Sequence, residues 1–460
     1  MCSNDEFSAL ASAKLMMSPQ LENNMSDEKG PIADRTVLRF AHAFESGGGT
    51  ERYLDDLDFT LLRRNEMTIV RLHLTRNPPN ENPIEERIGK GRLLRVPLQI
   101  IPTNGVAAEA NGHVSAPRLK QIIRDRLIYH PLVWNTVGSR WAASLSLPPR
   151  PGQAIGAGAA AAEILRARHV DLVVLHFFGG ADADEVLEAA RQSGTPVAIL
   201  NHYSNDRFLH LAIRKHAMLA DGIAGVNGLD LPAYLRGRFS NLSDGIDTEF
   251  FRSAHARPLA DRPPHPVILL PARVTREKGQ MDLIRAASSL RRSGIECCVA
   301  FAGRVDASGF AEELRQEIAR EGMSERVRFL GELSVEDLRD WYAASTVVAF
   351  PTYHHEGLGR VIVEAQAMEK PVVAYATGGV PEGIVSGKTG YLVPTGDVAG
   401  LTARLRELLT SLSLCGLLGI SGREMSENRF SLTALADRHE RFYSQVLTVR
   451  QASGREKRDR

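Results

Sequence analysis

Short apolar runs alternate with helix-like stretches along most of this chain. In the first half, the runs expected to form strands are 36–44, 70–74, 171–175 and 196–200. Between them, residues 50–62 and the alanine-rich stretch 159–167 have the composition of helices, because alanine has the highest intrinsic helix propensity. Strands that alternate with helices are typical of βαβ units, in which the strands of the sheet are parallel.

The alternation is interrupted once and then resumes. Residues 253–266 contain four prolines, a composition typical of a linker. Beyond them, the expected strands are 267–270, 297–302, 327–330, 347–350 and 372–375. We therefore predict two doubly wound, Rossmann-like α/β domains that face a cleft, with ligands bound where the strands end.

The predicted organisation also assigns the two ends of the chain. The first residues are polar and are expected to form a disordered leader, whereas an amphipathic pattern near the end predicts a closing helix. In chain order we expect a leader at 1–34, a first domain at 35–252, a linker at 253–265, a second domain at 266–430, a closing helix at 431–451 and a charged tail at 452–460.

Composition narrows the class of protein. Lys and Arg number 56 against 55 Asp and Glu, and the net charge of +1 argues against a protein that binds nucleic acid along its whole length. The four cysteines lack the spacing of a zinc or redox motif, and the adjacent Cys297 and Cys298 lie in an apolar run. No run is long enough to cross a bilayer and the start lacks a secretory signal, so we expect a cytoplasmic protein.

The first chemical motif follows the first strand of the second domain. Arg273 and Lys278 stand five residues apart in the stretch PARVTREKG, on a loop between a strand and a helix. Arginine offers a planar fork of donors and lysine a compact charge, so the pair suits a diphosphate. A solvated charged loop would have the same spacing.

The second motif, YHHEGLGRVIVEA, follows the strand at 347–350 and runs into a helix. Gly357 and Gly359 allow backbone N–H groups to approach an anion at the start of that helix. Glu356 lies in the loop and Glu364 lies one to two turns into the helix, so the two carboxylates are expected to bind different hydroxyl groups. For Glu364 the alternative is a surface ion pair with Arg360, four residues before it.

These residues resemble the retaining GT-B glycosyltransferases of family 4, also called group 1. The E-x7-E element of that family matches Glu356 and Glu364, and its phosphate loop matches 273–279. Gly303-Arg304 and the stretch 378–393 match further family elements, so the resemblance covers the second domain almost throughout. The first domain matches more loosely, through 48–52, the strand ending DLVVLHF, and 245–247.

The resemblance implies a two-domain fold in which the second domain binds a nucleotide-sugar donor. It implies that Arg273 and Lys278 neutralise the departing diphosphate, that Glu364 holds the ribose, and that Glu356 contacts the sugar. The amides of 357–359 (Gly357, Leu358, Gly359) and Gly303-Arg304 complete the donor site. No cofactor or metal is implied, and Asp182-Ala183-Asp184 is a chance match to a metal motif in the first domain.

In the first domain, His202 follows a strand and resembles the histidine that the family places near the donor sugar, although a solvated loop histidine is the alternative. The glycines Gly48 and Gly49 allow the first helix to approach the phosphates, or simply form a tight turn. We assign His202 to the catalytic residues, with Glu356, Arg273 and Lys278, and the two glycines to the donor-binding residues.

The sequence departs from the family pattern at two positions. Ala272 stands where a glycine usually precedes the phosphate-loop arginine, and Glu369 stands where a glycine usually ends a helix. A residue that ends a helix there is expected to adopt a positive φ, which costs a non-glycine residue about 1 kcal/mol. Neither residue is a proposed contact.

The acceptor is the least defined partner. The stretch 118–134 combines basic, apolar and aromatic residues, which suits a helix lying on the inner face of a membrane, although an ordinary amphipathic surface helix has the same pattern. We expect a glycan, lipid-linked or small-molecule acceptor, as in cell-surface polysaccharide synthesis. The alternatives are an epimerase or phosphorylase-like enzyme of the same fold, or a non-catalytic partner subunit of a glycosyltransferase.

Overall fold

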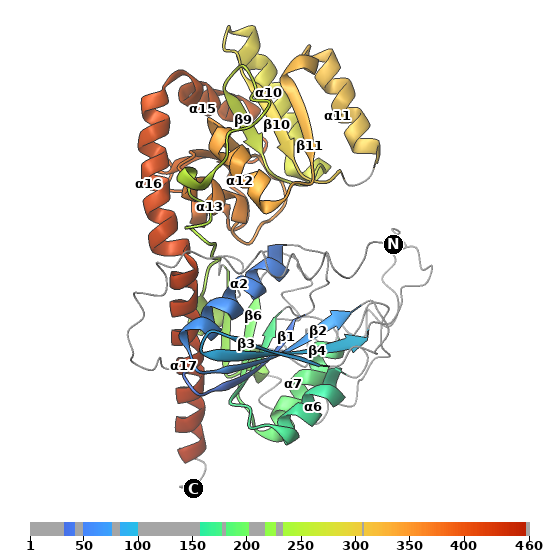
Figure 1. Ribbon diagram of the computed structural model, residues 1–460, viewed down its shortest axis with the longest axis vertical. Helices are drawn as coiled ribbons and strands as arrows, with labels where there is room; N and C mark the ends of the chain where they lie inside the picture. The colour runs from blue at the N-terminus through green and yellow to red at the C-terminus, as the bar shows by residue number, and fades with distance from the viewer. Residues whose placement is uncertain are drawn as a thin grey trace. The chain divides into compact units, whose positions relative to one another are not determined.

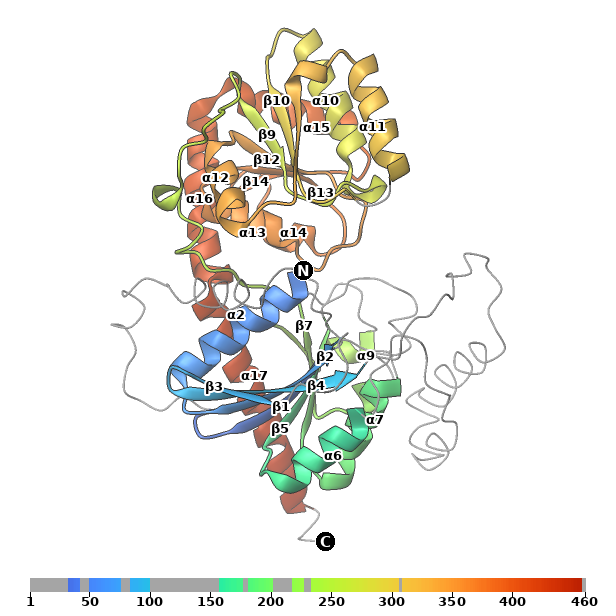
Figure 2. The ribbon, with the colours of Figure 1, turned by 45° about the vertical axis from the view of Figure 1, so that its right-hand side comes forward.

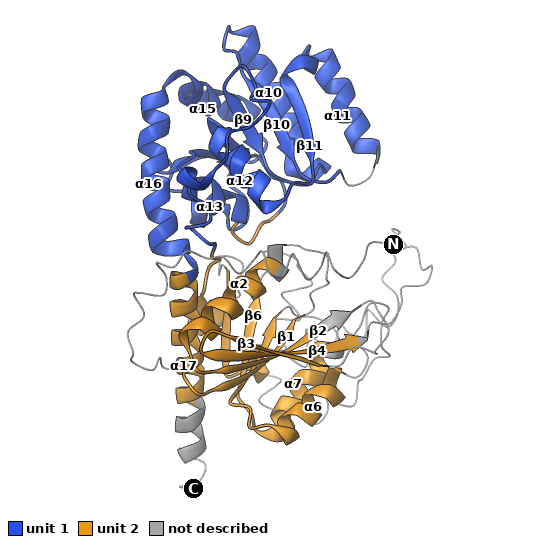
Figure 3. Cartoon of the chain, in the orientation of Figure 1, with its two compact units in different colours: residues 1–28, 246–354, 359–432 blue, residues 29–245, 355–358, 433–460 orange. Residues whose placement is uncertain are grey.

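The computed structural model describes the chain in the segments 32–41, 49–75, 83–99, 157–176, 181–201, 217–226, 233–305 and 308–456 (Figure 1). Contacts divide the chain into two compact units (Figure 3). The N-terminal domain takes its residues from 29–245, 355–358 and 433–460, and the C-terminal domain from 246–354 and 359–432. Within the described segments, no helix is long and apolar enough to span a bilayer.

The N-terminal domain is built on a sheet with the order β3-β4-β2-β1-β5-β6-β7-β8. Every neighbouring pair is parallel except β3–β4, which is antiparallel. The strands are β1 (Thr36–Ala41), β2 (Thr68–Thr75), β3 (Ile84–Ile88), β4 (Gly91–Gln99), β5 (Leu172–His176), β6 (Val197–Asn201), β7 (Gly222–Gly225) and β8 (Phe239–Asn241). Its helices are α2 (Gly49–Arg64), α6 (Ala157–Ala167), α7 (Ala181–Ser193), α9 (Ala233–Arg236) and, near the end of the chain, α17 (Leu432–Glu456).

Helix α17 is an integral part of the N-terminal domain. Arg39 of β1 is fully buried, forms an ion pair with Asp58 of α2, and donates a hydrogen bond of 3.0 Å to the hydroxyl of Tyr443 on α17. The hydroxyl of Tyr53 on α2 lies 2.9 Å from Nε2 of His439 on α17. A buried charge must be paired, so these contacts fix α17 against β1 and α2.

The C-terminal domain has a parallel sheet with the order β11-β10-β9-β12-β13-β14. Its strands are β9 (Val267–Leu270), β10 (Cys298–Ala302), β11 (Val327–Gly331), β12 (Val347–Phe350), β13 (Val372–Tyr375) and β14 (Gly390–Val393). Helices cover both faces, as expected of a doubly wound sheet: α10, α11 and α15 lie on one side and α12, α13 and α16 on the other (Figure 2). Their bounds are α10 (Gln280–Arg292), α11 (Ser308–Arg320), α12 (Val335–Ala344), α13 (Arg360–Ala367), α14 (Val380–Gly383), α15 (Val398–Thr410) and α16 (Leu412–Phe430).

The core of the C-terminal domain explains the apolar runs of its sequence. The strands β9, β12 and β13 are buried along their whole length, because each is covered by helices on both faces. Cys297 and Cys298 are buried and free, and burial raises the pKa of the Cys297 thiol to about 12. These cysteines therefore pack as small apolar residues, as predicted.

Glu369 adopts the strained conformation that its position predicts. It follows the end of α13 with φ of 57°. Its N–H donates to the carbonyl of Gln366, and the N–H of Lys370 donates to the carbonyl of Ala365, both at 2.9 Å. These two bonds form a Schellman motif, which favours glycine at the position Glu369 occupies.

The segment predicted as a linker is attached to the C-terminal domain. Arg257 donates to the carboxylate of Asp340 on α12 from both its backbone N–H, at 3.0 Å, and its Nε, at 2.7 Å. Further along the segment, Arg328 of β11 pairs with Asp261 at 2.9 Å. Although rich in proline, the segment is therefore held by specific ion pairs.

Candidate functional site

The order of the strands identifies a ligand position in the C-terminal domain. After β9, the next two strands along the chain, β10 and β11, are added on one side of it, whereas β12, β13 and β14 are added on the other side. The strand order therefore reverses between the neighbouring strands β9 and β12. In open α/β sheets ligands bind at such a switch point, outside the carboxyl ends of the strands. Both chemical motifs found in the sequence directly follow these two strands.

The loop after β9 is shaped by a glycine and a glutamine. Gly279 has φ of 75°, and a Cβ at this position would overlap the carbonyl oxygen of Pro351. The buried Gln280, the first residue of α10, donates from its side-chain amide to the carbonyl of Arg273 at 2.9 Å. The loop is thereby held at both ends. Lys278 is only 9% exposed, whereas Arg273 is exposed to solvent.

Gly303 brings the end of β10 against the same loop. A Cβ at Gly303 would overlap the carbonyl oxygen of Ala272 and lie 2.8 Å from the backbone nitrogen of Arg273. The backbone N–H of Val274 donates to the carbonyl of Arg304 at 2.9 Å. Gly303 therefore serves close backbone packing, whatever role its N–H has toward a ligand. Ala272 is partly buried and packs against the hydrophobic core of the C-terminal domain.

The loop after β12 is bonded directly to the loop after β9. The backbone N–H of Tyr353 donates to the carbonyl of Glu277 at 2.7 Å, and the hydroxyl of Thr352 donates to the same carbonyl at 3.3 Å. The N–H of His354 donates to the Thr352 hydroxyl at 3.1 Å. The two loops, separated by some seventy positions in the sequence, are thus joined by hydrogen bonds to the carbonyl of Glu277.

A buried carboxylate adds a second link between these loops. Asp282, in the first turn of α10, is 6% exposed and accepts hydrogen bonds at Oδ2 from the hydroxyls of Tyr353, at 2.6 Å, and Tyr375, at 2.8 Å. The rings of the two tyrosines meet edge to face with centroids 5.6 Å apart. Burial, followed by the hydrogen bond to Asp282, raises the pKa of Tyr353 to about 12.

Glu364 is buried within the C-terminal domain. Its Oε2 accepts a hydrogen bond of 3.0 Å from the hydroxyl of Tyr342, which lies on α12. Its Oε1 lies 3.8 Å from Nε of Arg360, and the two side chains are 4% and 12% exposed. The i,i+4 pair therefore exists, but it is not the solvated surface pair that the alternative interpretation assumed. A carboxylate fixed in this way is preorganised to accept further hydrogen bonds.

The remaining residues of the second motif lie between Tyr353 and Glu364 in the sequence. Glu356, Gly357 and Leu358 precede Gly359, which has φ of 86° and is the N-cap of α13. A Cβ at Gly359 would lie 2.9 Å from the ring of Phe350. The positive φ and this close contact together explain the glycine at the start of the helix.

Several predicted residues fall in the N-terminal domain. His202, Gly48 and the stretch 118–134 lie outside the described segments, as does nearly all of the predicted leader 1–34. Gly49 is the first residue of α2. Asp182 and Asp184 lie on α7, and among the described residues no group of three or more His, Cys, Asp or Glu side chains could hold a metal ion.

The sequence did not single out Gln280, Asp282, Tyr342 or Tyr375, which hold the proposed site residues in place. Three of the four lie in helices, where their polar side chains look solvent-exposed in sequence. The one available signal is that Gln280 and Asp282 lie within three residues after the glycine that ends the phosphate-loop motif.

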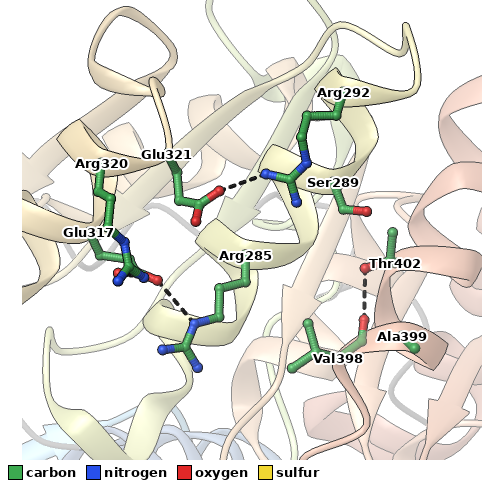
Figure 4. Close-up of a pocket in the computed structure, with 9 residues that line it drawn as sticks. All are labelled: Arg285, Ser289, Arg292, Glu317, Arg320, Glu321, Val398, Ala399 and Thr402. Carbon is green, nitrogen blue, oxygen red and sulfur yellow. Dashed lines mark hydrogen bonds and ion pairs between the residues drawn. The ribbon is translucent and has the colours of Figure 1, made fainter.

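A pocket of about 380 Å³ lies elsewhere on the C-terminal domain (Figure 4). Arginines of α10 pair there with glutamates of α11 and the turn that follows it: Arg285 with Glu317 at 3.0 Å and Arg292 with Glu321 at 2.7 Å. None of the site residues predicted from the sequence lines this pocket. The charges that line it are thus paired with one another between α10 and the segment of α11 and its following turn.

The sequence of this chain is similar to the sequences of known glycosyltransferases. Residues 252–425 match the family model described as glycosyl transferases group 1. The chain is 33% identical over 214 residues to the GDP-mannose-dependent alpha-(1-6)-phosphatidylinositol monomannoside mannosyltransferase of Mycolicibacterium smegmatis, an alignment that covers 41% of this chain and 54% of that protein. It is 28% identical over 325 residues to the corresponding monoacylated-substrate enzyme of Corynebacterium glutamicum, covering 65% of this chain and 81% of that protein.

A third relative is the D-inositol 3-phosphate glycosyltransferase of Streptomyces avermitilis, 32% identical over 42% of this chain and 44% of that protein. The chain thus spans about half the length of most of these curated relatives.

Solved structures agree on the fold. A glycosyltransferase from Rickettsia africae superposes with a TM-score of 0.65 at 18% identity, covering 90% of this chain and 99% of that one. Sucrose-phosphate synthase from Thermosynechococcus elongatus superposes with a TM-score of 0.63 at 20% identity, again over 90% of this chain and 99% of that one. These matches confirm the predicted GT-B fold of two Rossmann-like α/β domains.

Proposed function

We propose that this protein, whose residues 252–425 belong to the glycosyl transferases group 1 family, is a retaining, metal-independent glycosyltransferase that uses a nucleotide-sugar donor. One observation supports this most strongly. The loop with Arg273 and Lys278 and the loop with Glu356 follow neighbouring strands at the switch point of one sheet, and a backbone hydrogen bond joins them. The diphosphate-binding loop is thereby bonded to the start of the loop that carries Glu356.

In this proposal the charged residues divide the donor between them. Arg273 and Lys278 hold the diphosphate and stabilise the negative charge that develops on it as the bond to the sugar breaks. Glu364 accepts hydrogen bonds from the ribose hydroxyls, and Glu356 accepts from hydroxyls of the sugar. The buried position of Lys278 strengthens its charge interaction, because a less hydrated site screens the charge less.

The side chains proposed here would also replace a metal ion. Arginine and lysine at the phosphate loop, with the N-termini of α10 and α13 close after the two motifs, supply positive charge where a divalent ion would otherwise neutralise the leaving group. The reaction proposed is a front-side displacement. The leaving diphosphate oxygen accepts the proton of the incoming hydroxyl, the new glycosidic bond forms on the face the leaving group departs from, and the nucleoside diphosphate is released.

The names of the relatives narrow the first substrates to test. Two are named as GDP-mannose-dependent enzymes acting on phosphatidylinositol mannosides, and another as an inositol-phosphate glycosyltransferase. We therefore propose GDP-mannose as the first donor and inositol-containing lipids or small molecules as the first acceptors, with cell-surface glycan synthesis as the setting. Contact with the membrane through 118–134 remains our proposal.

A thermal-shift screen tests this function before an acceptor is known. The purified protein is heated with GDP, UDP or ADP and with their sugar conjugates, since a ligand that binds only the folded state raises the melting temperature. We expect one nucleotide and its sugar conjugate to raise the melting temperature, and the same nucleotide sugar to be consumed when the acceptor panel is added. Failure of every nucleotide and nucleotide sugar to bind would contradict the proposal.

A further inference from the structure

Three elements of the C-terminal domain converge on the carboxylate of Asp282. This residue lies four positions after Lys278, on α10. Tyr353 lies at the start of the loop that contains Glu356, and Tyr375 is the last residue of β13. Both phenols donate to the same carboxylate oxygen. Asp282 therefore connects the helix behind the phosphate loop with the loop after β12 and with the end of β13.

The exposure of the three side chains differs in an informative way. Asp282 is 6% exposed and Tyr375 is fully buried, whereas Tyr353 is 44% exposed. A buried carboxylate needs at least one donor, and Tyr375 supplies one without Tyr353. The bond from Tyr353 is thus not required to satisfy Asp282. It fixes a partly exposed ring that directly precedes the residues His354, His355 and Glu356.

Tyr353 remains a donor over the working range of pH. Its pKa is raised to about 12, first by burial and then by the hydrogen bond to Asp282. The pKa of Tyr375 is raised for the same reasons. Both phenols therefore keep their protons near neutral pH, and the two hydrogen bonds persist.

We propose that Asp282 is a positioning residue for the donor sugar, and that it acts through Tyr353 on the loop that carries Glu356. This inference rests on the proposed function, because it concerns how Glu356 is aimed at the sugar. The backbone hydrogen bond from Tyr353 to Glu277 holds the start of the loop. The side-chain hydrogen bond to Asp282 fixes the orientation of the Tyr353 ring, which directly precedes the residues that lead to Glu356. Binding of the diphosphate, which depends on Arg273 and Lys278, does not need this second bond.

The test compares Tyr353→Phe with a matched control, Tyr391→Phe. The hydroxyl of Tyr391 donates to Glu407 at 2.6 Å, the same kind of bond at the same distance, on β14 and α15 of the same domain. Isothermal titration calorimetry measures Kd for GDP and GDP-mannose and for UDP and UDP-glucose. The ratio of the two Kd values within a pair isolates the contribution of the sugar.

We expect Tyr353→Phe to weaken binding of the matching nucleotide sugar by about tenfold while the Kd of the nucleoside diphosphate changes by less than about twofold. Tyr391→Phe should leave the Kd of both ligands unchanged, while its melting temperature falls by about as much as that of Tyr353→Phe. Asp282→Ala, which removes the acceptor, should reproduce the effect of Tyr353→Phe, and if that variant fails to fold the tyrosine variants still decide.

Two results would overturn the inference alone. One is a Tyr353→Phe protein that binds both ligands as the wild type and Tyr391→Phe do. The other is a Tyr353→Phe protein that loses the nucleoside diphosphate as strongly as the nucleotide sugar, since this indicates a general structural role. A wild-type protein that binds none of the four ligands would instead contradict the proposed function, and this inference with it.

Discussion

The backbone N–H of Tyr353 donates a hydrogen bond of 2.7 Å to the carbonyl oxygen of Glu277. Glu277 directly precedes Lys278, and Tyr353 stands three residues before Glu356. A bond between backbone groups does not depend on the identity of the side chains, so it fixes the spacing of the two loops whatever ligand is bound. The fold therefore holds the start of the loop that carries Glu356 beside the residue that precedes Lys278.

Arg273→Ala and Lys278→Ala are each expected to lower turnover strongly with little change in melting temperature. Removing one preorganised charge contact to a developing negative charge typically costs about 2–4 kcal/mol of transition-state stabilisation, or about 30- to 1,000-fold in rate. Steady-state kinetics with the donor found in the screen measure the loss.

Arg276→Ala is the matched control for this pair. Arg276 lies in the same loop, but it is exposed and pairs with Glu313 of α11. Exposed ion pairs contribute little to stability, and Arg276 is not a proposed contact, so turnover should stay near the wild-type value. A double Arg273→Ala/Lys278→Ala protein with undiminished turnover would refute the diphosphate assignment.

Glu364→Gln is expected to weaken nucleotide binding by roughly tenfold, because a neutral amide is a poorer partner for ribose hydroxyls than a carboxylate. The amide can still accept from Tyr342, so the fold should tolerate the change. Tyr342→Phe removes that hydroxyl while keeping the carboxylate, and it should have a smaller effect on nucleotide Kd. Calorimetry with the nucleoside diphosphate distinguishes the two, and equal effects would argue against the ribose role.

Glu356→Gln should behave differently from Glu364→Gln. We expect the Kd of the nucleoside diphosphate to stay near the wild-type value while kcat and the preference among donor sugars change, because Glu356 is assigned to the sugar alone. Kinetics with two donors that share a nucleotide but differ in the sugar measure this selectivity. Weaker binding of the nucleoside diphosphate in Glu356→Gln would reverse the assignment of the two glutamates.

Glu369→Gly is expected to raise the free energy of unfolding by about 1 kcal/mol, since glycine adopts positive φ without the clash that Cβ causes. Glu369→Ala keeps the Cβ and should bring no such gain. Chemical denaturation of the three proteins measures the difference. A gain of equal size in Glu369→Ala would mean that the charge of Glu369, not its backbone conformation, is destabilising.

The ion pair between Asp340 and Arg257 predicts a pH-dependent contribution to stability. Partial burial alone would raise the pKa of Asp340, but the hydrogen bonds and charge of Arg257 outweigh it and lower the pKa below its usual value. A carboxyl whose pKa is lower in the folded state stabilises the fold above its unfolded pKa of about 3.9, and the contribution is lost as the pH falls through the folded pKa.

Asp340→Asn should therefore lower the melting temperature at neutral pH, with a difference from wild type that narrows below about pH 4. Glu336→Gln, an exposed change on the same helix, should show no such trend. A difference for Asp340→Asn that stays constant across this range would exclude the proposed linkage.

The sequence predicted most of the C-terminal fold because its strands are buried on both faces. The apolar runs at β9, β12 and β13 coincide with the observed bounds. The antiparallel edge strand β3 was missed, because its pattern IEERI is mostly charged and largely exposed. Helix α16 was not foreseen either, since its apolar residues lie on all sides and show no helical period.

The candidate site was predictable in its motifs but not in its supports. Residues near one another in sequence, such as Glu356 and Gly359, are found from local pattern. The partners of Asp282 lie 71 and 93 positions away along the chain, and only the folded sheet brings them together. Glu369 was predictable because the end of a helix imposes its backbone conformation locally.

The most direct test of the account is proton NMR of the transfer reaction, recorded as donor and acceptor are mixed with the wild-type protein. We predict that the nucleotide sugar is consumed without added metal and that the anomeric proton of the product shows the same configuration as the donor. Mass spectrometry after rapid quench should find no sugar bound to the protein. A product with inverted anomeric configuration, or a sugar covalently attached to Glu356, would contradict the account.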